Sequence, residues 1–137
     1  MSTIFTKIIN GELPGRIVYS DDRVAAFLTI QPLTAGHTLV VPRAEVDEWT
    51  DLEPALAGHV LSVAHTIGGA LKRAYRAPRV GLVIAGFEVP HAHVHVFTAE
   101  AMSDFDFARA GAMSDEELDT HQQRVIAALA NQGQDQD

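Results

Sequence analysis

The stretch HAHVHVF, residues 91–97, places three histidines at alternate positions and separates them by small or apolar residues. Side chains at alternate positions of a β-strand point to the same face of the sheet. The alternation therefore predicts a strand over Val89–Thr98. One face of this strand would carry His91, His93 and His95, and the other face would pack its apolar side chains on a core.

The residues around this strand predict an α+β fold. Apolar side chains recur at three- and four-residue spacings over Glu53–Tyr75, which indicates one long helix. Its Gly68-Gly69 pair either weakens it locally or marks a close approach to another element. A match to the capping box at Ser114-x-x-Glu117 opens a C-terminal helix over about 115–130. A short helix is predicted at Ile4–Ile9, and further strands at Arg16–Ser20, Val24–Ile30, His37–Pro42 and Val80–Ala85. Strands that follow one another through short turns indicate an antiparallel sheet with segregated helices.

Composition narrows the class of protein. A chain of 137 residues that is 47% hydrophobic fits a single domain over residues 1–137. The net charge of −8 and the lack of a clustered Lys/Arg stripe argue against a nucleic-acid polymer as partner, although a small anionic ligand fits a locally positive pocket. The opening MSTIFTKIINGELPG lacks the apolar core of a secretory signal, and no apolar run approaches the roughly 20 residues of a membrane span. Without cysteine there is no disulfide or thiolate site, so we expect a cytoplasmic protein without membrane association.

The histidine row has three interpretations on residue chemistry alone. It could be the solvated face of a strand, although Thr, Lys or Glu would be more usual there. It could bind a metal, but the Cα atoms of His91 and His95 would lie about 13 Å apart at a rise of about 3.3 Å per residue, and Zn–N bonds are only about 2.1 Å long. It could perform chemistry, because imidazole titrates near neutral pH and a neutral ring can attack phosphorus if its tautomer is fixed.

The sequence resembles the histidine-triad (HIT) nucleotide hydrolases and transferases in three segments. HAHVHVF matches the triad pattern His-φ-His-φ-His-φ-φ. PLTAGHTLVVPR, residues 32–43, is similar to the family segment that ends in GH-T-L-V-φ-P-K/R. IFTKIINGELPGRIVYSDDRVAAFLTIQP, residues 4–32, is similar to the family's N-terminal helix and hairpin. Together the segments cover most of residues 4–98 in the right order.

The resemblance implies a five-stranded antiparallel sheet, and a homodimer joined through the long helix and the strand before the triad. It also implies hydrolysis or transfer at the α-phosphate of a nucleotide conjugate, through a covalent nucleotidyl-histidine. His93 would be the nucleophile, His95 would contact the phosphate and assist proton transfer to the leaving group, and His91 would help to fix the row. His37 matches the family's additional histidine near the triad. The positions that commonly sandwich the base are Ile4, Phe5, Ile8, Phe27 and Ile30, each of which could equally be ordinary core.

Three departures from the family pattern concern the metal and the substrate. The structural zinc ligands of many members are replaced by Thr3, Thr6 and Glu45, so we expect neither a metal nor another cofactor. Thr29 stands where the family has an aspartate that binds the ribose hydroxyls, which predicts weaker or different ribose binding.

The loop before the triad is also shorter than in many members. Gly86 can supply the family's glycine, but Glu88 occupies a position near the phosphate, where an ionised carboxylate would repel it. Phe105 and Phe107 are expected to cover the edge of the site or a dimer partner. The alternative to an enzyme is a nucleotide-binding or interaction module that has kept the triad with little turnover. The base and the leaving group are not determined by the sequence.

Overall fold

A five-stranded antiparallel sheet forms the centre of the protein, whose computed structural model describes residues 2–131. The strands are β1 (Ile17–Ser20), β2 (Val24–Leu28), β3 (Thr38–Pro42), β4 (Arg79–Val83) and β5 (Val94–Ala99). Their spatial order is β1-β2-β3-β5-β4, so β1 and β4 are the edges. The predicted α+β class and five-stranded antiparallel sheet are confirmed.

Three α-helices lie where the sequence predicts them. They are α1 (Ile4–Ile9), α2 (Pro54–Tyr75) and α3 (Asp115–Ala130), and single-turn 3-10 helices span Trp49–Asp51, Met102–Phe105 and Phe107–Arg109. Side-chain caps set the starts of α1 and α3: the Thr3 side chain accepts a hydrogen bond from the Thr6 N–H, and the Ser114 side chain accepts one from the Glu117 N–H. α2 has no such cap and begins instead with Pro54 in its first turn. Within the part of the chain that is described, no helix is both long enough and apolar enough to cross a membrane.

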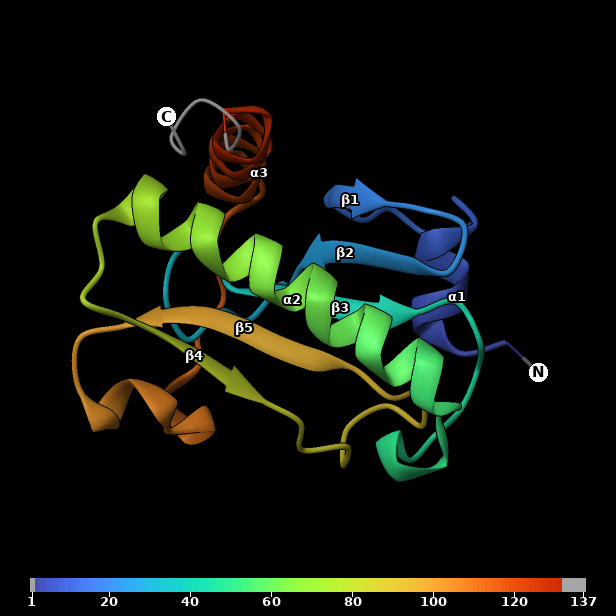
Figure 1. Ribbon diagram of the computed structural model, residues 1–137. Coiled ribbons are helices and arrows are strands. Elements are labelled where there is room, and N and C mark those ends of the chain that lie inside the picture. Colours follow the sequence, from blue (N-terminus) through green and yellow to red (C-terminus); the bar gives the residue numbers. More distant parts are fainter. Residues whose placement is uncertain (1, 132–137) are drawn as a thin grey trace.

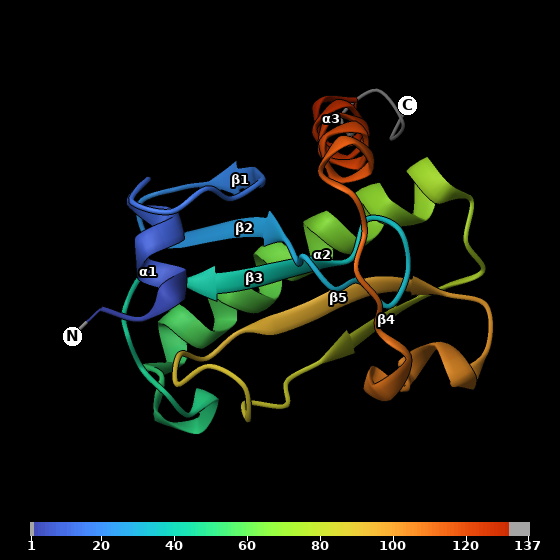
Figure 2. The same cartoon turned by 180° about the vertical axis from the view of Figure 1, so that it is seen from behind.

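The two faces of the sheet carry different layers. The long helix α2 crosses one face (Figure 1), and α1 lies on the opposite face (Figure 2). The main core joins α2 and α3 to the sheet and includes Ile67, Leu71 and Val96. A smaller cluster under α1 is built from Phe5, Phe27, Leu39 and Val41. Because successive side chains of a strand point to opposite faces, one set packs in the core on the α2 face and the other set in a smaller layer on the α1 face.

Glycine in α2 permits the close approach of helix and sheet. A Cβ atom built on Gly68 would lie 3.3 Å from Val80 Cγ1 and 3.7 Å from Val96 Cγ1. Of the two interpretations of the Gly68-Gly69 pair, the close approach is the one that applies, because α2 runs unbroken through it.

The ends predicted for the strands differ more from the structure than the ends predicted for the helices. β5 begins at Val94 rather than Val89, because its pairing with β3 runs from Thr38↔Val96 to Val40↔Val94 and extends no further. Before that point the backbone makes other bonds: the Ala92 N–H donates to the Val46 carbonyl at 2.7 Å. Of the three histidines only His95 therefore lies in a regular strand. The other strands are corrected by one or two residues to the bounds above: β1 starts one residue later than predicted, β2 ends at Leu28, β3 starts at Thr38 and β4 spans Arg79–Val83.

Candidate active site

A cavity of about 860 Å³ opens on the α1 face of the sheet, and two histidines of the row, His93 and His95, line it. Ten of the predicted site residues line it: His37, His93, His95, Ile4, Phe5, Ile8, Phe27, Thr29, Ile30 and Glu88. The hairpin, the start of β3, α1 and the segment leading into β5 each contribute part of the wall. The structure thus brings together positions that are up to 91 residues apart in the sequence.

His91 and Gly86 lie outside the lining of this cavity. The His91 side chain is fully buried, with Nε2 2.7 Å from the Pro42 carbonyl oxygen and Nδ1 2.6 Å from Thr3 Oγ1. A carbonyl only accepts, so His91 donates from Nε2, while its Nδ1 pairs with the Thr3 hydroxyl. His91 thereby anchors the start of the triad to β3 and α1. Gly86 adopts φ +80° in the loop before the triad, a left-handed conformation that favours glycine.

The hydrogen bonds of His93 define its tautomer. Its Nδ1 lies 2.7 Å from the backbone carbonyl oxygen of His91, so Nδ1 must carry the proton. The lone pair is then on Nε2. Burial lowers the pKa of His93, opposed by the hydrogen bond to His91 and by the carboxylate of Glu88. At neutral pH this ring is a neutral imidazole with one free lone pair.

A chain of hydrogen bonds assigns the tautomers of His37 and His95 in turn. The Leu33 N–H donates to His37 Nδ1 at 3.0 Å, so His37 carries its proton on Nε2. His37 Nε2 lies 3.0 Å from His95 Nδ1 and donates to it, which leaves the proton of His95 on Nε2. Burial, with a smaller contribution from the neighbouring imidazole, lowers the pKa of His37 to about 3 and that of His95 to about 4. His95 therefore presents an N–H donor while remaining uncharged.

Aromatic side chains hold the two central rings from both sides. The Phe5 ring lies edge-on to His93 with centroids 4.9 Å apart, and Phe107 packs on His95 at 4.8 Å. The rings of His93 and His95 are 5.0 Å apart. Phe107 lines the cavity, as expected from the alternation in DFDFARAG, whereas Phe105 packs on Phe97 at 4.9 Å.

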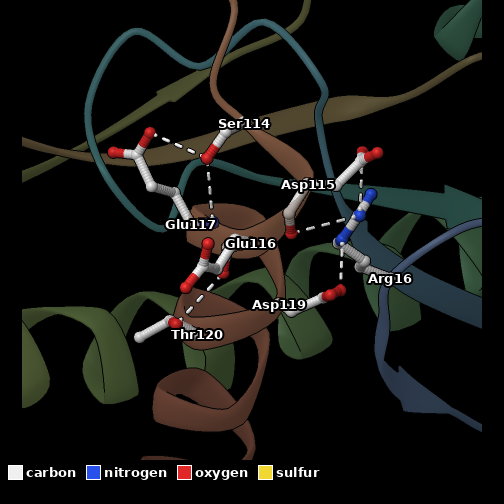
Figure 3. Close-up of polar contacts among 7 residues, drawn as sticks. All are labelled: Arg16, Ser114, Asp115, Glu116, Glu117, Asp119 and Thr120. Atoms are coloured by element: carbon white, nitrogen blue, oxygen red, sulfur yellow. Dashed lines mark hydrogen bonds and ion pairs between the residues drawn. The ribbon is translucent and has the colours of Figure 1, made fainter.

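The outer rim of the cavity is polar and contains residues that sequence reasoning missed. Arg16 donates from Nε to Asp119 at 2.9 Å and from Nη2 to Asp115 at 3.1 Å, as Figure 3 shows. No local pattern signals this cluster, because Arg16 is about a hundred residues away from its partners and α3 meets β1 only in the folded chain. Elsewhere on the rim, the Thr29 hydroxyl accepts a hydrogen bond from the Gln31 N–H at 3.3 Å, and Glu88 is exposed.

The three residues at the positions of the family's structural zinc ligands form a hydrogen-bonded cluster. The Thr3 N–H donates to Glu45 Oε1 at 2.8 Å, while the Thr3 hydroxyl contacts His91. Hydrogen bonds from the Thr6 side chain and the Thr3 backbone lower the pKa of Glu45. Two hydroxyls beside one carboxylate do not suit zinc, which prefers thiolate and imidazole ligands. Across residues 2–131 no group of three or more His, Cys, Asp or Glu side chains is placed to hold a metal ion.

The sequence has relatives in distant microorganisms. An uncharacterized HIT-like protein of Borreliella burgdorferi is 41% identical over 118 residues, which are 81% of this chain and 85% of that protein. An uncharacterized HIT-like protein of Methanocaldococcus jannaschii is 35% identical and covers 85% of this chain and 92% of its own.

Solved structures share the fold at lower identity. A zinc-bound histidine triad family protein of Mycobacterium smegmatis superimposes with a TM-score of 0.85 at 26% identity and covers 98% of both chains. A hypothetical histidine triad nucleotide-binding protein of Sulfolobus tokodaii gives a TM-score of 0.82 at 26% identity, over 93% of this chain and 91% of its own. The family model for the HIT domain matches residues 10–102. With that match, these relatives and the triad geometry, the chain belongs to the HIT domain family.

Proposed function

We propose that this protein hydrolyses or transfers the nucleotidyl group of a nucleotide conjugate, of the phosphoramidate or dinucleoside polyphosphate type, through a covalent intermediate on His93. Membership of the HIT family supports nucleotide-related hydrolase or transferase chemistry at the level of the family. The observation that carries the proposal to this chain is the tautomer of His93. Its Nδ1–H is held by the His91 carbonyl, so the Nε2 lone pair is available for attack in a cavity large enough for a nucleotide.

In the first step His93 Nε2 attacks the α-phosphorus. The P–Nε2 bond forms, the bond from phosphorus to the leaving atom breaks, and its electron pair goes to the leaving group. The attacking ring becomes positively charged, and the hydrogen bond from Nδ1 to the His91 carbonyl oxygen stabilises that charge. His95 Nε2–H donates a hydrogen bond to the phosphate or the leaving atom, and His37 keeps His95 in the required tautomer.

In the second step water, or another acceptor, attacks the same phosphorus. The new O–P bond forms as the P–Nε2 bond breaks, the electron pair returns to Nε2, and the proton of water passes to solvent. The base would occupy the apolar part of the cavity between α1 and β2, where Phe5, Ile8 and Phe27 present their side chains.

Rapid quenching tests this proposal. The protein is incubated with a panel of nucleoside phosphoramidates and dinucleoside polyphosphates, and the triad peptide is examined by mass spectrometry for an added nucleotidyl mass. We expect the adduct on His93 and a fall in kcat of at least about a thousandfold in a His93→Gly variant, because the nucleophile is lost. Nucleotide binding with neither adduct nor turnover across the panel would favour the binding-module alternative.

We also propose that two copies associate through α2 and β4. An edge strand offers unpaired backbone N–H and C=O groups to a second strand, and β4 is an edge. Beside it an apolar groove of about 240 Å³ separates β4 from the first half of α2, with Leu61 and Leu82 exposed at its sides. Light scattering should give twice the chain mass, and Leu82→Lys should shift it towards the monomer.

A further inference from the structure

We propose that Glu88 makes this cavity select conjugates whose leaving group is an amine over conjugates whose leaving group is a chain of phosphates. This inference rests on the proposed function and narrows its substrate class. It follows from the charges that line the cavity, from the hydrogen bonds of its histidines and from the position of Glu88 among them.

The cavity has more carboxylates than free cations. Within residues 2–131 its lining includes three carboxylates, from Glu88, Asp115 and Asp119, and one guanidinium, from Arg16. That guanidinium is already bound by the two aspartates (Figure 3), with only 19% of its side chain exposed. The positive charge of the rim is therefore compensated before any substrate arrives, and Glu88 adds a further negative charge.

The histidines do not make up for this deficit of positive charge. Each of His37, His93 and His95 is a neutral imidazole at neutral pH, as its hydrogen bonds and its lowered pKa indicate. A single phosphate can still bind through the N–H donor of His95, because a hydrogen bond needs no net charge. Every additional phosphate brings negative charge into a cavity whose uncompensated charge is also negative.

Glu88 lies on the rim of the same cavity that contains the attacking ring. It is three residues before His91, lines the cavity with His93, and its charge is close enough to raise the pKa of that imidazole against the effect of burial. A solvent-exposed carboxylate is ionised at neutral pH and accepts hydrogen bonds only. The group it suits is a donor with positive charge.

An amine leaving group has these properties at the moment of bond cleavage. The bridging nitrogen of a phosphoramidate takes a proton from solvent, and the resulting P–NH2⁺–R group donates to the Glu88 carboxylate. When His93 Nε2 attacks, the P–Nε2 bond forms and the P–N bond breaks, its electron pair stays on nitrogen, and R–NH2 departs. The proton gained from solvent is balanced in the second step, when the attacking water releases one. His95 can thus remain neutral throughout.

The test compares two substrates with the same nucleoside, one a 5′-phosphoramidate of an alkylamine and the other a dinucleoside triphosphate. In Glu88→Gln the ratio of kcat/KM for the triphosphate to kcat/KM for the phosphoramidate should rise about tenfold. A tenfold change corresponds to about 1.4 kcal/mol, which is the size expected when one nearby charge is removed. Glu88→Lys should raise it further. The matched control is Glu53→Gln, which removes the same charge from an exposed position outside the cavity lining and should leave the ratio unchanged.

Ionic strength provides a readout that a merely structural role of Glu88 would not affect. Added salt should reduce the preference of the native protein for the phosphoramidate over the triphosphate, because salt screens the exposed charge of Glu88. The preference of Glu88→Gln, which lacks this charge, should change little. An equal ratio in the native protein and both Glu88 variants, with turnover retained, would overturn this inference and leave the proposed function standing. Absence of adduct and turnover with either substrate would instead overturn the proposed function.

Discussion

The inner wall and the outer rim of the cavity differ in how much of their hydrogen-bonding capacity the protein itself uses. On the inner wall the rings of His37, His93 and His95 are at most 7% exposed, and each has at least one nitrogen bonded within the chain. On the rim Glu88 is exposed and Thr29 is half-buried. The wall is thus organised before substrate binds, whereas the rim still has polar groups to offer. We infer that the wall determines the reaction and the rim determines the substrate.

This difference has a cost in stability. Burying imidazoles in their neutral form makes the folded state resist protonation. The comparison can be tested by perturbing the wall first and the rim last.

The largest expected effect is on stability in acid. Burial holds the pKa of His37 at about 3 and that of His95 at about 4, against 6.5 for both in the unfolded chain. As the pH falls below about 6.5, the unfolded chain takes up protons that the folded chain does not. The free energy of unfolding should therefore be highest above pH 6.5 and fall by up to about 1.4 kcal/mol per pH unit for each histidine down to pH about 4. Urea unfolding at a series of pH values measures this slope.

A variant at His37 isolates the contribution of the wall from that of the carboxylates. His37→Gln removes one of the two buried imidazoles whose pKa falls to 4 or below, so the dependence of the free energy of unfolding on pH between 6.5 and 4 should become shallower than in the native protein. An unchanged slope would mean that other groups dominate acid unfolding and that the buried histidines of the wall do not cause the loss of stability.

Two substitutions at His37 test the assignment of tautomers. His37→Ala removes the donor to His95 Nδ1, so His95 is free to carry its proton there and to lose the Nε2–H donor facing the substrate. We expect kcat to fall about a hundredfold with a small change in KM, because acid–base and tautomer effects of this kind act mainly in the transition state. His37→Gln keeps an N–H donor and should recover part of the loss. Equal activity of the two variants would contradict the role of the hydrogen bond.

The sequence predicts the wall and the helices better than the rim, for a physical reason. The bounds of α1, α2 and α3 follow from caps and periodicity within one stretch of chain, so they agree with prediction to within a residue. Strand ends depend on a partner elsewhere, and β5 accordingly begins five residues later than predicted.

The site residues follow the same rule. The triad and His37 belong to continuous motifs, so the local sequence is enough to predict them as candidate site residues. The cluster of Arg16 with Asp115 and Asp119 depends on how α3 packs against β1, and no local pattern contains that information. A further difference concerns His91, whose full burial follows from the hydroxyl of Thr3 and the carbonyl of Pro42 rather than from its place in the triad.

The smallest expected effect is on the rim, at the position where the family binds ribose. The Thr29 hydroxyl accepts from the Gln31 N–H, so part of its acceptor capacity is used inside the protein. In Thr29→Asp one carboxylate oxygen can keep that bond and the other can accept from ribose, a charge-assisted pair worth about 1.5–3 kcal/mol. We expect KM for a ribonucleotide conjugate to fall about tenfold relative to KM for its 2′,3′-dideoxy analogue. Thr29→Asn, which keeps the shape without the charge, should show a smaller change. If all three proteins discriminated equally between the two sugars, ribose would not contact this position, and the division between a wall for chemistry and a rim for substrate would have to exclude Thr29.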